Sequence, residues 1–293
     1  MNLLMDKTDI SVIIPVYNEG ATIGKLIKQI KTLYPDFEII IINDGSTDDT
    51  GLIARELGAI VYSHPYNIGN GAAIKSGIRI ASGEILVFMD GDGQHDPDDI
   101  KKLLDYFPDY DMVVGTRSMS GQASLFRAVC NKVLNRLAAY VTKTRIEDLT
   151  SGFRAVKSGV AHNLLYLLPN TYSYPTTLTL AGLRSGRSIK YVPIHADIRR
   201  KGKSNIRIFR DGIRFFLIIA KICALYSPLR IFLPISLILF LLGLGYYLFT
   251  YATMGRFTNM SALLFSTSII IFMMGLVSEQ ICQMRFESSE KNG

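Results

Sequence analysis

Cysteine is scarce in this chain and shows no paired spacing. The three cysteines are Cys130, Cys223 and Cys282. Disulfide frameworks and structural zinc sites both depend on regularly spaced cysteines, so the sequence argues against both. A secretory signal is not expected either, because the stretch before the first apolar run covers only residues 1–10 and includes charged residues, namely Asp6, Lys7 and Asp9.

Charged side chains are absent from two long stretches, residues 231–255 and 257–278, which are rich in Leu, Ile, Phe and Met. Each stretch is long enough to cross a bilayer, which needs roughly 20 apolar residues. The alternative is a pair of buried core helices, but a soluble domain of this size has little core in which to bury both on all sides. We therefore expect a transmembrane hairpin over residues 229–286, with spans at about 231–253 and 259–281.

Basic residues gather before the first of these spans. They are Arg199, Arg200, Lys201, Lys203, Arg207, Arg210, Arg214, Lys221 and Arg230. Arg256 is the only charged residue in the turn between the spans. The positive-inside rule then places the large domain and both termini in the cytoplasm, in a multi-pass protein of the cell membrane. Nucleic acid is the competing partner for a basic cluster, but a position beside a span favours anionic lipid or phosphate.

Residues 1–204 have the alternating pattern of an α/β domain. Apolar runs predict strands at residues 10–14, 37–42, 60–62, 85–89, 111–114 and 189–192. Helices are expected at residues 20–33, from about 48, and at 70–81, 125–141 and 176–186. Strands that alternate with helices indicate a mainly parallel sheet with right-handed crossovers.

Residues 205–228 form a separate juxtamembrane segment in this interpretation. Between residues 206 and 224 an apolar stripe at helical spacing lies beside a basic stripe. A helix of this kind can lie in the membrane interface. The alternative is a helix that packs against the domain.

Asp90 and Asp92 are the most informative residues of the α/β region. They follow the apolar run at residues 85–89, which reads as a buried strand. Two carboxylates at the end of a strand can converge on a divalent cation, and Mg²⁺ typically takes one or two carboxylates together with substrate phosphates. The alternative is a polar turn, since Asp and Gly are common turn residues.

Polar clusters follow four predicted strands, and together they resemble a known family. The clusters are Pro15-Val16-Tyr17-Asn18-Glu19, Asn43-Asp44-Gly45-Ser46, Asp90-Gly91-Asp92-Gly93-Gln94 and Gly115-Thr116-Arg117. The motifs "VIIPVYNE", "INDGSTDDT", "NIGNGAA" and "MDGDGQHDP" resemble glycosyltransferase family 2, which has the GT-A fold. "DLTSGFRA" at 148–155, "RRKGKSN" at 199–205 and the two spans are similar to the branch of dolichyl-phosphate mannose synthases and bacterial polyprenyl-phosphate glycosyltransferases.

The resemblance implies a metal-dependent hexosyltransferase that uses Mg²⁺ or Mn²⁺. The expected metal ligands are Asp92, Asp90 and Gln94, and the expected catalytic residues are Asp92, Asp90 and Arg117. The residues expected to bind the nucleotide sugar are Pro15, Tyr17, Glu19, Asp44, Asn67, Gly69, Asp90, Gln94 and Arg199. Those expected to bind a lipid phosphate are Arg117, Arg127, Ser151 and Arg199. Guanidinium groups suit bidentate phosphate recognition.

One position departs from the family pattern. The motif "RxxGxSK" ends in Lys, whereas this chain has Asn205 there. Lys203 or Arg207 could supply the missing charge, and the alternative is that the whole segment is a solvated basic loop. The resemblance is also compatible with a homo-tetramer.

The function expected from the sequence is transfer of one sugar from a UDP- or GDP-linked donor to undecaprenyl or dolichyl phosphate, with inversion. A polysaccharide synthase would need more spans than two. A non-catalytic membrane adaptor would not need both carboxylates and the strand-end clusters. A nucleotidyltransferase would carry a Gly-rich phosphate loop near the start of the chain. The sugar, the base, the polyprenol length and the oligomer stay open.

Overall fold

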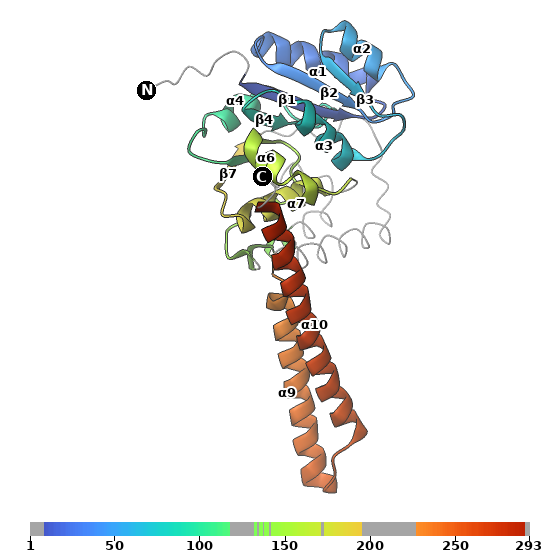
Figure 1. Ribbon diagram of the computed structural model, residues 1–293, viewed down its shortest axis with the longest axis vertical. Coiled ribbons are helices and arrows are strands. Elements are labelled where there is room, and N and C mark those ends of the chain that lie inside the picture. The colour runs from blue at the N-terminus through green and yellow to red at the C-terminus, as the bar shows by residue number, and fades with distance from the viewer. Residues whose placement is uncertain are drawn as a thin grey trace. The chain divides into compact units, whose positions relative to one another are not determined.

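The computed structural model describes residues 9–117, 132–133, 135–136, 138–140, 142–170, 173–194 and 227–290. The chain divides into two compact units, residues 1–218 and 219–292 (Figure 1). The expected juxtamembrane segment, residues 205–228, lies almost entirely outside the described residues. The three-part division at 204 and 228 therefore stays a prediction.

The described part of the first unit contains a seven-stranded sheet in the order β3-β2-β1-β4-β6-β5-β7. The strands are β1 Ile10–Val16, β2 Glu38–Asn43, β3 Ile60–Ser63, β4 Ile85–Phe88, β5 Met112–Arg117, β6 Arg154–Lys157 and β7 Ile189–Ile194. Strand β6 is antiparallel to both of its neighbours, whereas the other pairs are parallel. The prediction of a mainly parallel α/β fold is confirmed.

Helices cover both faces of the sheet. They are α1 Gly20–Leu33, α2 Thr50–Glu56, α3 Asn70–Ile80, α4 Asp99–Leu104, α6 Ser158–Asn163 and α7 Tyr174–Arg184, with a short 3₁₀ helix, η2, at Leu165–Leu167. Val12 and Ile14 of β1 share a core with α1. Ile13 points to the opposite face, where a β-carbon on Gly77 of α3 would lie 2.3 Å from Ile13 Cγ2. The two-residue period of a strand thus sends alternate side chains to helices on opposite faces.

Four elements were not expected from the sequence, namely β6, α4, α6 and η2. The sequence of β6, RAVK, is only four residues long and has a charged residue at each end. Arg154 at its start is nevertheless fully buried. Patterns of apolar side chains cannot indicate such a strand, because arginine is rarely buried completely.

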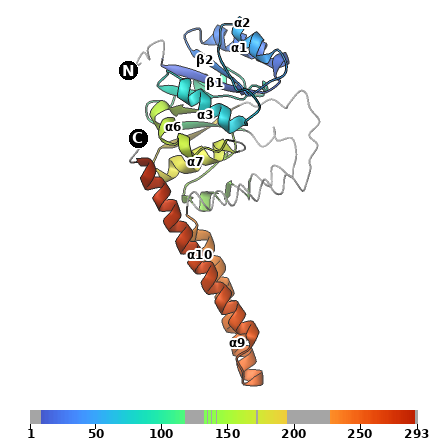
Figure 2. The ribbon, with the colours of Figure 1, turned by 45° about the vertical axis from the view of Figure 1, so that its right-hand side comes forward.

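The second unit contains two long helices, α9 Leu229–Met254 and α10 Asn259–Glu290, which run side by side as a hairpin (Figure 2). Their apolar windows have mean hydropathies of 2.2 and 2.1, with only 11% and 17% of the window buried. Length, composition and outward apolar side chains fit two membrane spans. The prediction of two apolar C-terminal helices is confirmed.

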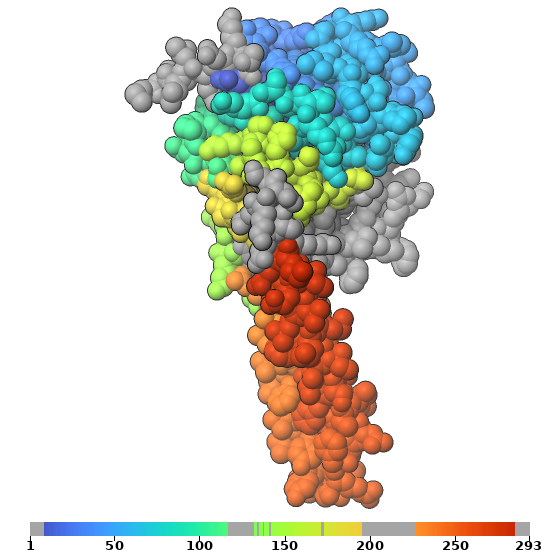
Figure 3. All heavy atoms as spheres, in the orientation of Figure 1, coloured from blue at the N-terminus to red at the C-terminus, as the bar shows by residue number. Residues whose placement is uncertain are grey.

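The atoms of α9 and α10 pack against one another along the hairpin (Figure 3). Small residues and polar contacts lie between the two helices. A β-carbon on Gly275 would lie 2.7 Å from Phe232 Cβ, so the helices approach closely there. Ser268 donates a hydrogen bond to the carbonyl of Ser236 at 2.8 Å. Glu279 of α10 accepts hydrogen bonds at the start of α9, from the Ser227 hydroxyl at 3.1 Å and from the Leu229 N–H at 3.2 Å.

Candidate active site

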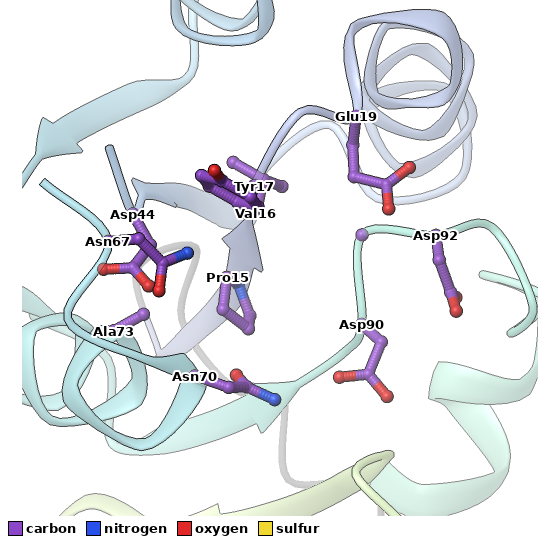
Figure 4. A pocket seen from close by; sticks show the side chains of 11 residues that line it. Pro15, Val16, Tyr17, Glu19, Asp44, Asn67, Asn70, Ala73, Asp90 and Asp92 are labelled. Carbon is purple, nitrogen blue, oxygen red and sulfur yellow. The ribbon is translucent and has the colours of Figure 1, made fainter. Parts of the chain in front are cut away.

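A pocket of about 360 Å³ opens at the carboxyl ends of β1, β2 and β4. Its lining residues are Pro15, Val16, Tyr17, Glu19, Asp44, Asn67, Asn70, Ala73, Asp90, Gly91 and Asp92 (Figure 4). Most of the residues expected to bind the nucleotide sugar therefore share one cavity. Ligands of open α/β sheets bind at this edge. Asn70, which lies below Pro15 in Figure 4, was not selected from the sequence.

Asp44 and Asn67 lie together at one end of the pocket (Figure 4). The Asp44 carboxylate is buried and accepts hydrogen bonds from the backbone N–H groups of Ile68 at 3.0 Å and Gly69 at 2.8 Å. Gly69 does not line the pocket, and its contribution to the site is the hydrogen bond that its N–H donates to Asp44. The charge-assisted bonds fix the loop that carries Asn67.

Gly45 allows this loop to approach β2 closely. Its φ is +73°, and a β-carbon there would lie 2.4 Å from the carbonyl carbon of Tyr66 and 2.6 Å from the nitrogen of Asn67. Both the positive φ and the contact with backbone atoms require glycine. The turn after β2 thus sets the position of the whole loop.

His64 is a contributor to the site that the sequence analysis missed. Its Nδ1 lies 2.6 Å from Asp44 Oδ1, and its Nε2 lies 2.9 Å from the Ser76 hydroxyl on α3. The side chains of His64 and Asp44 are each 5% exposed. A lone histidine gives no signal in a sequence, because its two partners lie 20 and 12 residues away.

Asp90, Asp92 and Glu19 lie at the other end of the pocket (Figure 4). Asp92 accepts a hydrogen bond from the N–H of Gln94 at 3.1 Å. Gln94 does not line the pocket, so its role as a metal ligand stays a prediction. Glu19 is held by the Thr22 hydroxyl, which lies 3.1 Å from Glu19 Oε2 and 3.2 Å from the Gly91 carbonyl.

The carboxylates fit a divalent cation only together with a substrate. Within the described ranges, no group of three or more His, Cys, Asp or Glu side chains is close enough to hold a metal. Mg²⁺ is commonly bound by one or two carboxylates and completed by phosphate oxygens and water. Asp90 and Asp92 match that donor set, because they line an open pocket that can admit a diphosphate.

The "DLTSGF" segment packs against Asp90. A β-carbon on Gly152 would lie 2.8 Å from Asp90 Oδ2. The His95 ring stacks on Phe153 with centroids 5.0 Å apart, and its Nε2 lies 3.8 Å from Asp90 Oδ2. Tyr174 donates a hydrogen bond to the Gly152 carbonyl at 3.1 Å. Burial, and then the nearby charge of Asp90, raises the pKa of Tyr174, so its hydroxyl stays a donor.

Arg154 ties this segment to α7, and the sequence analysis did not select it. Its guanidinium is fully buried and donates to the Ser151 carbonyl, to the Pro175 carbonyl at 3.0 Å and to the Thr179 hydroxyl at 3.0 Å. Burial lowers the pKa of Arg154, although the group stays protonated because an arginine titrates so far above neutrality. A buried cation thus fixes the turn that faces Asp90.

The four residues expected at the lipid phosphate are not brought together by the described part of the chain. Ser151 is fully buried and does not line the pocket; its N–H donates to Asp148 Oδ1 at 3.0 Å, and its hydroxyl donates to the Phe153 carbonyl at 3.5 Å. The backbone of Arg117 ends β5. Arg127 and Arg199 lie outside the described residues.

Two family models match the chain. Residues 11–165 match the model of glycosyl transferase family 2, and residues 227–284 match the GtrB C-terminal hairpin. The second match coincides with α9 and most of α10.

The chain is also similar to individual proteins. The chain is 31% identical over 201 residues to the uncharacterized protein MJ1222 of Methanocaldococcus jannaschii, a match that covers 65% of this chain and 82% of that protein. Glucosyl-3-phosphoglycerate synthase from Mycobacterium tuberculosis, in complex with Mn²⁺, UDP and glucosyl-3-phosphoglycerate, has a similar fold with a TM-score of 0.60 and 23% identity, over 74% of this chain and 79% of that one. Its complex with Mn²⁺ and UDP-glucose gives a TM-score of 0.57 and 22% identity, over 72% and 79%. By its motifs, its GT-A fold and its match to the family model, the chain belongs to glycosyl transferase family 2 and carries a hairpin of the GtrB type.

Proposed function

We propose that the protein transfers a single hexose from a nucleotide sugar to polyprenyl phosphate and inverts the anomeric carbon. The observation that carries the proposal is the joint presence in one chain of the strand-end pocket and the GtrB-type hairpin. The pocket supplies a place for a nucleoside diphosphate sugar. The hairpin supplies a reason for the acceptor to be a membrane lipid.

The two ends of the pocket suit the two ends of the donor. In this proposal the base and ribose bind beside Asp44 and Asn67 and the diphosphate binds beside Asp90 and Asp92, all of which line the pocket. Asp92 and Asp90 would hold the Mg²⁺ or Mn²⁺ ion, which when bound neutralises the charge of the leaving diphosphate. Support for a divalent metal comes from the Mycobacterium tuberculosis synthase, which is known in complexes with Mn²⁺ and UDP-glucose.

Catalysis in this proposal is mainly positioning. The acceptor phosphate is anionic at neutral pH, so it can attack the anomeric carbon without a strong general base. A single displacement on the face opposite the leaving group inverts that carbon. Asp90 and Asp92 would hold the diphosphate of the donor through the metal ion, while the loop that follows β2 holds the base.

The acceptor phosphate is assigned to Arg117, Arg127 and Arg199, because guanidinium groups bind phosphate in a bidentate manner. Ser151 is buried, and its contact with the lipid phosphate stays a prediction. The catalytic unit and both termini are placed in the cytoplasm, since the basic residues precede α9 and only Arg256 lies in the turn. Homo-tetramer formation stays a prediction.

The proposal is tested by incubating the purified full-length protein with Mn²⁺, undecaprenyl phosphate and a panel of radiolabelled UDP- and GDP-sugars. We expect label to move from one nucleotide sugar into an organic-soluble lipid that releases a monosaccharide on mild acid treatment. A water-insoluble polymer would indicate a polysaccharide synthase instead. Metal-dependent donor binding without transfer to any lipid phosphate would indicate the adaptor and contradict the proposal.

A further inference from the structure

The hydrogen bonds around Asp44 leave it little capacity to accept more. A carboxylate has about four acceptor positions. On Oδ1 they are taken by His64 Nδ1 at 2.6 Å and the Ile68 N–H at 3.0 Å, and one position on Oδ2 is taken by the Gly69 N–H at 2.8 Å. Among the described residues no further donor is recorded for Asp44, so a single acceptor position remains. Asp44 lines the pocket, which makes that position available to a ligand.

His64 is held so that it donates to Asp44. The Ser76 hydroxyl lies 2.9 Å from His64 Nε2 and can donate to it, which leaves the proton on Nδ1, facing Asp44 Oδ1 at 2.6 Å. Ser76 is on α3, and Asp44 follows β2. The histidine therefore joins two elements on either side of the base end of the pocket and prevents Asp44 from rotating.

From this arrangement we infer that His64 restricts Asp44 to one incoming donor and thereby selects a uracil nucleotide over a guanine nucleotide. The inference rests on the proposed function and names its donor class. Uracil presents one ring N–H between two carbonyl oxygens. Guanine presents two adjacent donors, the ring N–H and the amino group, and a carboxylate recognises them best when both of its oxygens are open.

Asn67 completes the match to uracil. Its side chain lies beside Asp44 in the pocket (Figure 4). An amide can donate to a carbonyl, so Asn67 and Asp44 offer a donor next to an acceptor. This pattern fits the neighbouring carbonyl and N–H of uracil. With guanine the second donor would be desolvated without a partner, which is the costly case in polar recognition.

The experiment measures the dissociation constants of UDP and GDP by calorimetry, with Mn²⁺ and the full-length protein in detergent. The wild type should bind UDP roughly ten-fold or more tightly than GDP. Equal binding, or tighter binding of GDP, would overturn the inference. This comparison needs no variant, so a substitution that fails to fold leaves it decisive.

Two substitutions then assign the preference to His64. His64→Asn places an amide donor where Nδ1 lies and should keep most of the preference, whereas His64→Leu frees that acceptor position of Asp44 and should reduce the preference several-fold, mainly by tightening GDP binding. His162→Leu, at an exposed histidine of α6, is the matched control and should leave the ratio unchanged. A folded His64→Leu protein with the wild-type ratio would refute the role of His64.

The inference and the proposed function can fail separately. Sugar transfer from a GDP-sugar to polyprenyl phosphate, with no transfer from any UDP-sugar, would overturn the base selection and leave the proposed function intact. Tight UDP binding without transfer to any lipid phosphate would support the selection and contradict the function. Failure of both nucleotides to bind would refute both.

Discussion

The α-carbon of Gly152 lies directly against the carboxylate of Asp90, so that an added β-carbon would come within 2.8 Å of Oδ2 and 3.2 Å of Oδ1. Gly152 precedes β6, and Asp90 follows β4, which pairs with β6 in the sheet. The contact explains why a glycine stands in the "SGF" turn. No side chain of this turn lines the pocket, but through Gly152 the turn contacts Asp90, which we propose to bind the metal.

Gly152→Ala should therefore displace Asp90 and raise the Mn²⁺ concentration needed for half-maximal transfer by roughly ten-fold. The matched control is Gly159→Ala in α6, where an added β-carbon meets nothing within 4 Å. We expect the control to retain wild-type activity and metal dependence. A Gly152→Ala protein with an unchanged Mn²⁺ titration would show that the contact does not position Asp90.

Asp92→Ala should abolish transfer while the protein stays folded and membrane-bound, because the change removes a ligand of the proposed ion. EDTA should have the same effect on the wild type, and added Mn²⁺ should reverse it. Asp109→Ala, at an exposed aspartate away from the pocket, serves as the control. Full activity of Asp92→Ala, or of the wild type in EDTA, would contradict the metal assignment.

Arg154→Leu should destabilise the catalytic unit by roughly 2–5 kcal/mol. The change removes the charged donor that the buried carbonyls of Ser151 and Pro175 share, and a hydrogen bond to a charged group is typically worth about 1.5–3 kcal/mol. The measurement is denaturant unfolding followed by circular dichroism in detergent. Arg79→Leu, at an exposed arginine of α3, should change the stability by less than about 0.5 kcal/mol. Equal stability of the two variants would refute the structural role of Arg154.

Gly275→Leu should separate the hairpin helices, because the side chain would collide with Phe232. Overpacking of this kind typically costs about 1–3 kcal/mol. Gly245→Leu is a matched control, since an added β-carbon there meets nothing within 4 Å. A disulfide between cysteines introduced at Gly243 and Leu264 reports the pairing, because a β-carbon on Gly243 would lie 3.1 Å from Leu264 Cβ. We expect its yield to fall in Gly275→Leu and to stay unchanged in Gly245→Leu.

Membrane orientation can be read from cysteine labelling in intact cells, with the native cysteines replaced by serine. An impermeant maleimide should label a cysteine at Phe257, in the turn between α9 and α10, because only Arg256 accompanies it there. A cysteine at Asp109, exposed on the catalytic unit, should react only after the membrane is permeabilised. The reverse pattern would place the catalytic unit outside and remove its access to cytoplasmic nucleotide sugars.

Local patterns predicted much of the fold. The helical spacing of Ile23, Leu26, Ile27 and Ile30 indicated α1, and all four are buried on its inner face. Apolar runs located β1, β2 and β4 because their side chains are buried on both sides of the sheet. Residues that follow parallel strands meet at one edge, and so most of the pocket could be predicted from the strand ends.

What could not be predicted depends on contacts between distant segments. His64 obtains its role from Asp44 and Ser76, and Arg154 obtains its burial from acceptors on α7. The sequence on either side of His64 and of Arg154 does not distinguish them from exposed residues. Ser151 was selected from a motif, and its side chain is packed inside the domain, so its role in ligand binding stays a prediction.

Strand β6 lies between β4 and β5 although it follows both of them in the sequence. While the chain is being synthesised, β1 to β4 can pair as soon as residue 88 has left the ribosome, and the base end of the pocket can form with them. Residues 152–157 emerge some seventy residues later, and only then can β5 join the sheet through β6. The end of the pocket that holds Asp44 can thus form before the chain that contains Gly152, which contacts Asp90, has been synthesised.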